Sequence, residues 1–181
     1  DSGGFDDKSF NQAGYDGLKR AVTQLGVTEA HAESTADTDY APNIDNMIQQ
    51  KCDLTITVGF LLADATKAAA AANPTMHFAI IDNQFFDAAF KPLTIANIKP
   101  LLFNTAEAAF LAGYLAAGVT TTGTVATFGG IQIGPVTTFM ACFVHCVAAY
   151  TADPLTQACR TRWARAGTQA SGPVGFHDHS T

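Results

Sequence analysis

"LTITVGFLLADATKAAAAANPTMHFAIIDN", residues 54–83, holds two short apolar segments with an alanine-rich segment between them. The β-branched run Leu54–Val58 predicts a buried strand, and the apolar run 76–81 predicts a second one. Between them, Ala63–Ala72 predicts a helix that ends at Asn73-Pro74, because a proline disfavours helical backbone at the residue before it. This strand–helix–strand order is typical of two parallel strands in one sheet.

Upstream of this unit, the sequence predicts two further helices. Residues 9–25 have apolar side chains at helical spacing, and Gly26 is suited to end that helix. Pro42 is expected as the first residue of the next helix, with Ile44, Met47 and Ile48 on its buried face. The segment between the two helices, residues 27–33, is a weaker strand candidate.

Downstream, the alternation continues: strands are expected at residues 98–103 and 124–128, and helices at 105–117 and 135–150. The sequence therefore predicts an α/β fold with a parallel sheet and helices on both faces. Ligands of such sheets bind beyond the carboxyl ends of the strands. Gly59-Phe60, Asp82-Asn83 and Gly129-Gly130 follow predicted strands and occupy that place, although Asp-Asn is also ordinary turn chemistry.

Composition limits the classes of function. The 181 residues are 48% hydrophobic and 14% charged, which suits a globular domain or pieces of two. A net charge of −6 argues against a nucleic-acid partner, because phosphate-binding surfaces are basic. The longest apolar run, residues 108–119, is too short to span a bilayer.

The opening stretch, "DSGGFDDKSFNQ" (residues 1–12), places two glycines among acids just before a predicted helix. Carboxylates at Asp1, Asp6 and Asp7 repel phosphate but accept hydrogen bonds from hydroxyl and ring N–H donors. The stretch therefore suits an uncharged polyhydroxyl or nucleobase ligand, with Phe5 and Phe10 as stacking faces. A turn with acids that favour a helix N-terminus explains the pattern equally well.

The cysteines and histidines near the C-terminus allow two interpretations. Cys142, His145 and Cys146, with Cys159, His177 and His179 later, have a spacing that zinc sites use. Cys142 and Cys146 also lie four apart on a predicted apolar helix, where cysteine acts as a small hydrophobe. We favour the second interpretation and expect no metal and no cofactor. The sequence contains no catalytic motif, so we expect no enzyme.

Five ordered blocks within residues 1–150 resemble the basic membrane protein family of bacterial solute-binding lipoproteins. They read "DSGGFDDKSFNQAGYDGLKRA", "DLTITVGFLLADATKAAAAANP", "FAIIDN", "EAAFLAGYLAAG" and "GTVATFGGIQIGPVTTFM". The best-understood members of that family are purine nucleoside receptors of ABC transporters. The resemblance implies the type I periplasmic-binding-protein fold, in which two α/β lobes close over a ligand.

The resemblance also implies a division of the chain. Residues 1–104 would be lobe one without its first strand, residues 105–150 the start of lobe two, and residues 151–181 a divergent, irregular tail. We therefore expect an incomplete fold that lacks the first strand and most of lobe two.

Ligand contacts follow from the family's pattern, position by position. Asp1 and Asn11 match the acid and the asparagine of the opening block. Asp82 matches an acid used for sugar hydroxyls, while Phe5 and Phe60 are candidate base or wall contacts by location. The implied function is capture of a purine nucleoside outside the cytoplasmic membrane, on a lipid-anchored protein, for delivery to an ABC permease.

Two alternatives stay open: a cytosolic Rossmann-like enzyme that handles nucleosides or nucleotides, and a ligand sensor of the same binding fold. An upstream leader with a lipid-type cysteine favours the transport receptor, and nucleoside turnover favours the enzyme. Neighbouring permease and ATPase genes distinguish a transport component from a sensor.

The segment "FMACFVHCVAAY" (residues 139–150) departs from the family's pattern, which has Asp and Gly where this chain has Ala141, Cys142, His145 and Cys146. Each difference is reachable by a single base change, and the resemblance ends there. We hypothesise an error-containing or frameshifted gene read near residue 150. An intact reading frame on resequencing would refute that hypothesis.

A parallel sheet without one of its central strands has unpaired backbone groups and uncovered apolar helix faces. We therefore predict that the 181-residue chain by itself folds poorly or aggregates. Thermal unfolding followed by circular dichroism tests this, and a cooperative transition would contradict it.

Overall fold

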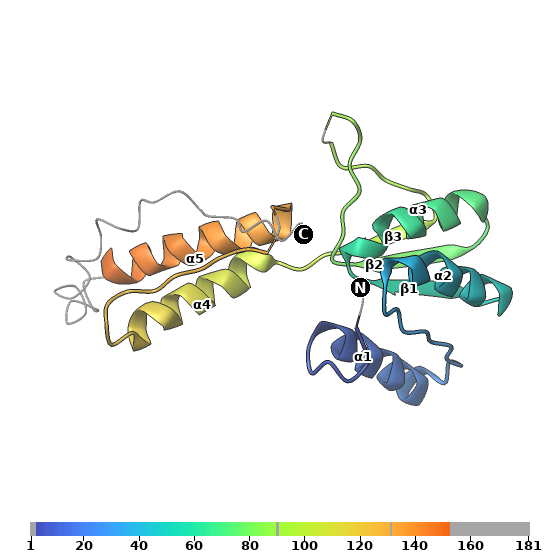
Figure 1. Cartoon of the computed structure of the whole chain (residues 1–181), viewed down its shortest axis with the longest axis horizontal. Coiled ribbons are helices and arrows are strands. Elements are labelled where there is room, and N and C mark those ends of the chain that lie inside the picture. Colours follow the sequence, from blue (N-terminus) through green and yellow to red (C-terminus); the bar gives the residue numbers. More distant parts are fainter. Residues whose placement is uncertain (1–2, 90, 131, 153–181) are drawn as a thin grey trace. The chain divides into compact units, whose positions relative to one another are not determined.

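The computed structural model describes residues 3–89, 91–130 and 132–152, which form two compact units. The boundary between the units lies between Phe103 and Asn104 (Figure 1). The first unit contains α1 (Phe10–Leu25), η1 (Asp37–Asp39), α2 (Tyr40–Gln49), β1 (Leu54–Val58), η2 (Phe60–Leu62), α3 (Ala63–Ala72), β2 (His77–Ile81) and β3 (Ile98–Leu101). The second contains α4 (Thr105–Val119) and α5 (Gly134–Ala152).

The sheet of the first unit is parallel, as the sequence predicts, with strand order β1-β2-β3. Thr55 pairs with Phe78, and Phe78 pairs in turn with Ile98. Leu54–Val58 and Ala63–Ala72 have the predicted bounds, and β2 begins one residue later than expected. The strand–helix–strand prediction is therefore confirmed.

The core lies between β2 and β3 on one side and α2 and α3 on the other. Phe78 and Ile80 of β2 are the centre of a buried cluster that also includes Ile44, Ala70, Phe85 and Ile98. β1 joins it through polar contacts: the hydroxyls of Thr57 and Thr66 lie 2.9 Å apart in buried surroundings. A buried hydroxyl with a partner avoids the desolvation penalty of an unpaired one, so this polar contact helps to hold α3 to β1.

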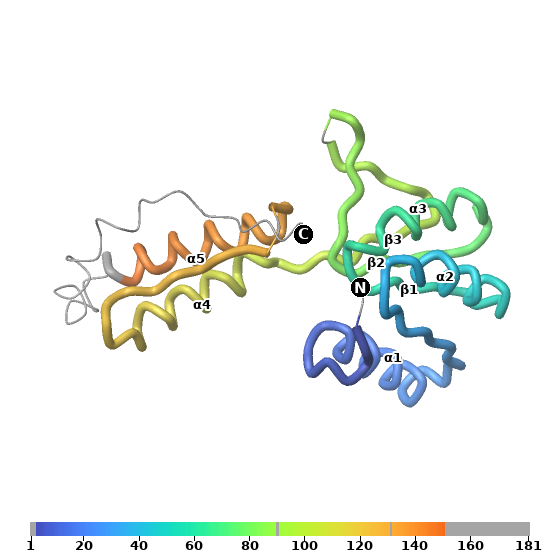
Figure 2. Tube along the Cα trace, viewed as in Figure 1, coloured from blue at the N-terminus to red at the C-terminus, as the bar shows by residue number. Residues whose placement is uncertain are grey.

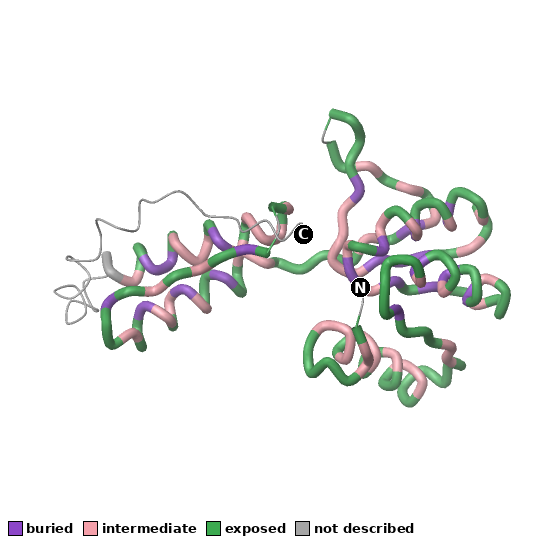
Figure 3. The backbone as a smooth tube through the Cα atoms, viewed as in Figure 1, coloured by how far each residue is buried: buried purple, intermediate pink, exposed green. Residues whose placement is uncertain are grey.

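The opposite face of the sheet is covered in part by α1. A Cβ atom on Gly14 would lie 3.3 Å from a methyl group of Val58, so α1 and β1 approach closely there. Leu54 and Ile56 point to the same face as Val58, because side chains alternate along a strand, and they remain 51% and 47% exposed. Figure 3 shows the alternation of buried and exposed positions along the elements.

In the second unit, α4 and α5 approach so closely at position 113 that only glycine fits there. A Cβ atom on Gly113 would lie 2.4 Å from the carbonyl oxygen of Phe143. Ala117 and Val147 form the buried cluster between the helices. The other side of α4 is apolar but exposed, with Leu111 and Leu115 the clearest examples.

Two strand predictions are wrong. Within residues 27–33 no strand forms, and the nearest pairing is an isolated antiparallel bridge between Gly3 and Ser34. Residues 124–128 are not a strand either; they run back along α4 and α5 (Figure 2), where Val125 packs on the cluster between the helices. A strand needs a hydrogen-bonded neighbour, and neither segment has one among the described residues.

Helix predictions hold with small shifts. α2 begins at Tyr40, two residues before Pro42. Proline is tolerated there because the first N–H groups of a helix have no partner within it. α1 ends as predicted at Gly26, whose φ of 68° is in the left-handed region that favours glycine. No described helix is long and apolar enough to cross a membrane.

The contrast between exposed and buried isoleucines gives a matched test of this core. We expect Ile80→Ala to lower the free energy of unfolding by about 2–5 kcal/mol, because Ile80 is fully buried. Ile56→Ala removes the same atoms from a half-exposed position and is expected to cost about 1 kcal/mol or less. Urea unfolding followed by circular dichroism compares the two, and equal losses would contradict this packing.

Candidate functional site

The turns after β1 and β2 meet at one edge of the sheet. The amide of Gly59 donates to the carbonyl of Ile81 over 3.1 Å, and the amide of Asp82 donates to the carbonyl of Leu101 over 2.8 Å. Gly59 has a φ of 102°, which a residue with a side chain rarely adopts, and the chain then turns into η2 at Phe60. The carboxyl ends of the strands thus bring Phe60 and Asp82 to the same edge.

Asp82 is held in an unfavourable state in two respects. Its φ is 63°, in the left-handed region that is uncommon for residues other than glycine. Its side chain is half-buried, and this burial raises the pKa of the Asp82 carboxyl. Strained and desolvated carboxyls are more common at functional sites than elsewhere, which supports its candidacy as a ligand contact.

Asn83 is a residue whose role the sequence did not single out from ordinary turn chemistry. Its Nδ2 atom is buried and has no hydrogen-bond partner among the described residues. Unpaired buried donors are rare, so each one requires an explanation. Its position directly after a buried strand is the one sequence signal that could have indicated a role.

The opening loop uses one of its acids to begin α1. Asp7 Oδ1 accepts from the backbone amides of Ser9 (2.8 Å) and Gln12 (3.1 Å), and Oδ2 accepts from the amide of Asn11 (3.0 Å). These bonds, of which that from Gln12 is the strongest influence, lower the pKa of Asp7. For Asp7, the interpretation as a helix-favouring acid is therefore the right one.

Asn11 lies in the first turn of α1, half-buried, and its Nδ2 donates to Asp7 Oδ2 over 3.0 Å. The loop backbone passes directly over it, since a Cβ atom on Gly3 would come within 2.6 Å of Nδ2. α1 contacts β1 one turn later, where a Cβ atom on Gly14 would meet Val58, the last residue of β1. Asp1 lies outside the described residues.

Phe5 is also half-buried, but an aromatic ring of the protein already covers it. Its ring is stacked on Tyr15 with the centroids 4.3 Å apart and the planes at 10°. Any planar ligand at Phe5 would have to use the other face of its ring. The ligand roles of Asp1, Phe5, Asn11, Phe60 and Asp82 remain predictions.

The cysteine pair of α5 belongs to the helix contact. Cys146 is buried against Gly113 of α4, and burial raises the pKa of its thiol, as does the neighbouring Cys142. Cys146 thus acts as a small hydrophobe, as predicted. The described residues contain no group of three or more His, Cys, Asp or Glu side chains able to hold a metal. Cys159, His177 and His179 lie outside them, as does the tail from residue 153 onward.

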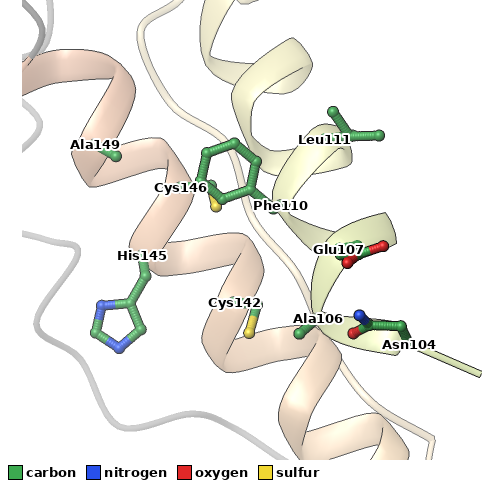
Figure 4. A pocket seen from close by; sticks show the side chains of 9 residues that line it. All are labelled: Asn104, Ala106, Glu107, Phe110, Leu111, Cys142, His145, Cys146 and Ala149. Carbon is green, nitrogen blue, oxygen red and sulfur yellow. The ribbon is translucent and has the colours of Figure 1, made fainter.

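A cavity of about 760 Å³ opens between α4 and α5. Phe110, Leu111, Cys142 and Ala149 are among its mostly apolar lining, which also includes Glu107 and His145 (Figure 4). None of the predicted ligand residues lines it. We therefore place the candidate site at the strand ends of the first unit.

Comparison with known proteins points to one family. A family model described as "ABC transporter substrate-binding protein PnrA-like" and named Bmp matches residues 1–154. Basic membrane protein A of Borreliella burgdorferi is 34% identical over 130 residues, which are 72% of this chain and 37% of that protein. The ABC transporter nucleoside-binding protein BmpA of Lactococcus lactis is 34% identical over 143 residues, which are 77% and 39% of the two chains.

Solved structures show the same relationship at the level of the fold. An ABC transporter solute-binding protein from Aeropyrum pernix K1 aligns with a TM-score of 0.69 and 27% identity, covering 83% of this chain and 42% of that one. A second from Conexibacter woesei aligns with a TM-score of 0.56 at 19% identity, which shows the fold alone. The chain spans about two fifths of the curated relatives that it matches.

The burial of Asp82 gives a prediction about stability and pH. Burial raises the pKa of Asp82 above the ordinary 3.8 because it disfavours the charged carboxylate in the folded state. The neutral carboxyl therefore contributes stability at low pH, and this contribution is lost as the pH rises through the folded-state pKa. We expect Asp82→Asn, which is neutral throughout and tolerates positive φ, to melt at a higher temperature than the unmodified chain near pH 7. This difference should shrink as the pH falls toward the ordinary carboxyl value.

Asp53→Asn is the matched control, because Asp53 is exposed and lies just before β1, at the opposite edge of the sheet. Its effect on the melting temperature should not change in the same way between the two pH values. A gain for Asp82→Asn that is independent of pH would show that backbone conformation, and not desolvation, is the cause.

Proposed function

The chain belongs to the Bmp family of PnrA-like ABC transporter substrate-binding proteins, and we propose that it binds a purine nucleoside outside the cytoplasmic membrane for delivery to an ABC permease. The observation that carries the proposal is the match of residues 1–154 to that family. The name of the Lactococcus lactis relative, a nucleoside-binding protein, supports the choice of ligand class.

The chemistry of the strand-end edge suits an uncharged, hydroxyl-rich ligand. Asp82 presents a desolvated carboxylate, which accepts hydrogen bonds from hydroxyl groups and repels phosphate. Asn83 presents a buried amide donor without a partner among the described residues. A ligand with both hydroxyl donors and an acceptor would satisfy the two side chains together, which nucleosides can do.

The proposal assigns the first unit to lobe one and the second to the beginning of lobe two. Ligand capture makes and breaks no covalent bond, so the protein needs no nucleophile or cofactor. Closure of two lobes over the ligand would couple binding to recognition by the permease. We further propose that a lipid anchor holds the protein at the membrane.

A thermal-shift panel tests the ligand class. We expect inosine, guanosine or adenosine to raise the melting temperature of the restored full-length protein, and the corresponding nucleotides to have little effect, because a phosphate would face the acids of the site. Stabilisation by a nucleotide but not by its nucleoside would overturn this assignment. Stabilisation by sugars alone would replace the nucleoside with another solute.

Substitutions at the edge locate the site. Asp82→Asn and Asn11→Ala are expected to weaken nucleoside binding roughly ten- to a hundredfold, the size of a lost hydrogen bond that involves a charged or buried group. Asp53→Asn, at the other edge of the sheet, should bind as the unmodified chain does. Calorimetric titration measures these affinities, and unchanged binding by Asp82→Asn would remove Asp82 from the site.

A further inference from the structure

Three aromatic rings from separate parts of the first unit are in mutual contact. Phe5 of the opening loop is stacked on Tyr15 of α1, with the centroids 4.3 Å apart. His31 lies edge-on to both rings, at 5.4 Å from Phe5 and 5.2 Å from Tyr15. Such contacts favour one arrangement of the rings over others, beyond the apolar area that they bury.

Two charged side chains join these rings in a closed set of contacts, which we call the circuit: Phe5, Tyr15, Lys19, Glu29 and His31. Lys19, one turn after Tyr15 on α1, places its Nζ atom 5.0 Å from the centroid of the Tyr15 ring. The same ammonium group is hydrogen-bonded to Glu29. Glu29 Oε1 in turn lies 3.7 Å from Nδ1 of His31. The circuit thus links the opening loop, α1 and the segment that follows α1.

The loop backbone is tied at the same place. The amide of Phe5 donates to Oε1 of Glu33 over 2.6 Å, and the amide of Gly3 donates to the carbonyl of Ser34 over 3.0 Å. These are contacts over nearly thirty residues of sequence, so they hold the loop against a distant segment. Neither of them involves Phe60 or Asp82, the ligand residues proposed at the strand ends.

We propose that Tyr15 and His31 are positioning residues, which hold the Phe5 ring and the loop around it in place before a ligand arrives. Tyr15 covers one face of Phe5 and His31 lies edge-on to it, so the two residues together fix the orientation of the Phe5 ring. A loop ordered in advance loses less conformational entropy on binding, and the affinity rises accordingly. The consequence for affinity rests on the proposed function, whereas the consequence for loop order does not.

Tyr15→Leu in the full chain tests the proposal, because leucine keeps an apolar side chain but removes the stack. We expect faster hydrogen exchange at the Phe5 amide and unchanged exchange at the Ile80 amide in the core. Inosine should bind about three- to tenfold more weakly. Tyr15→Phe keeps the ring but removes the hydroxyl that interacts with Lys19, so it should restore most of both values. A loss of general stability could not explain such a recovery.

Lys19→Met tests the charged part of the circuit and has a matched control in Lys67→Met. Methionine retains most of the aliphatic stem, and Lys67 is an exposed residue of α3. We expect Lys19→Met to speed exchange at the Phe5 amide, by less than Tyr15→Leu does, and Lys67→Met to leave it unchanged.

The two readouts separate this inference from the proposed function. Unchanged exchange at Phe5 in Tyr15→Leu would overturn the positioning role, whether or not a nucleoside binds. Faster exchange with unchanged inosine affinity would show that the loop is held but does not serve the ligand, which also overturns the proposal. If the unmodified chain binds no nucleoside, the proposed function fails, and the exchange measurements still decide whether Tyr15 holds the loop.

Discussion

The parallel pairing of β1 with β2 is the constraint on which the rest of the first unit depends. Its register aligns Val58 with Ile81, so the two strands end together and the following turns share one edge. A shift of one residue would turn Thr55 and Thr57 out of the core and bring Leu54 and Ile56 into it. That shift would break the buried contacts of the Thr57 hydroxyl with Thr66 of α3 and with the Ala79 carbonyl, so these contacts favour the observed register.

Asp7 and Asp82, two acids of the first unit, have different physical roles. Asp7 accepts three backbone amides and the amide of Asn11, which stabilises its charge and begins α1. Asp82 is desolvated, which destabilises its charge. A carboxyl with satisfied hydrogen bonds contributes to folding, whereas a carboxyl that burial disfavours is available to a ligand able to donate to it. At least one acid of the opening stretch, Asp7, therefore serves to begin α1.

Apolar surface distinguishes the two units from an ordinary compact domain. Leu54 and Ile56 on the sheet, and Leu111 and Leu115 on α4, are half-exposed or more. A helix that is apolar on every side is usually buried on every side, but α4 has that composition and exposes Leu111 and Leu115. The curated relatives are more than twice as long as the part of them that this chain matches.

The sequence by itself determined the elements whose signals are local. Leu54–Val58 and Ala63–Ala72 follow from β-branched and alanine-rich runs with a proline stop, and the order of blocks was enough to indicate the family. It could not determine residues 27–33 or 124–128, because an extended run becomes a strand only when a partner strand lies beside it. Only the tertiary structure decided that Asp7 holds Asn11, that Tyr15 covers Phe5, and that Asp82 is desolvated, next to an Asn83 Nδ2 atom with no partner in the described part of the chain. These facts depend on neighbours that are close in space, or on the burial that packing produces, and neither can be read from a residue's own type.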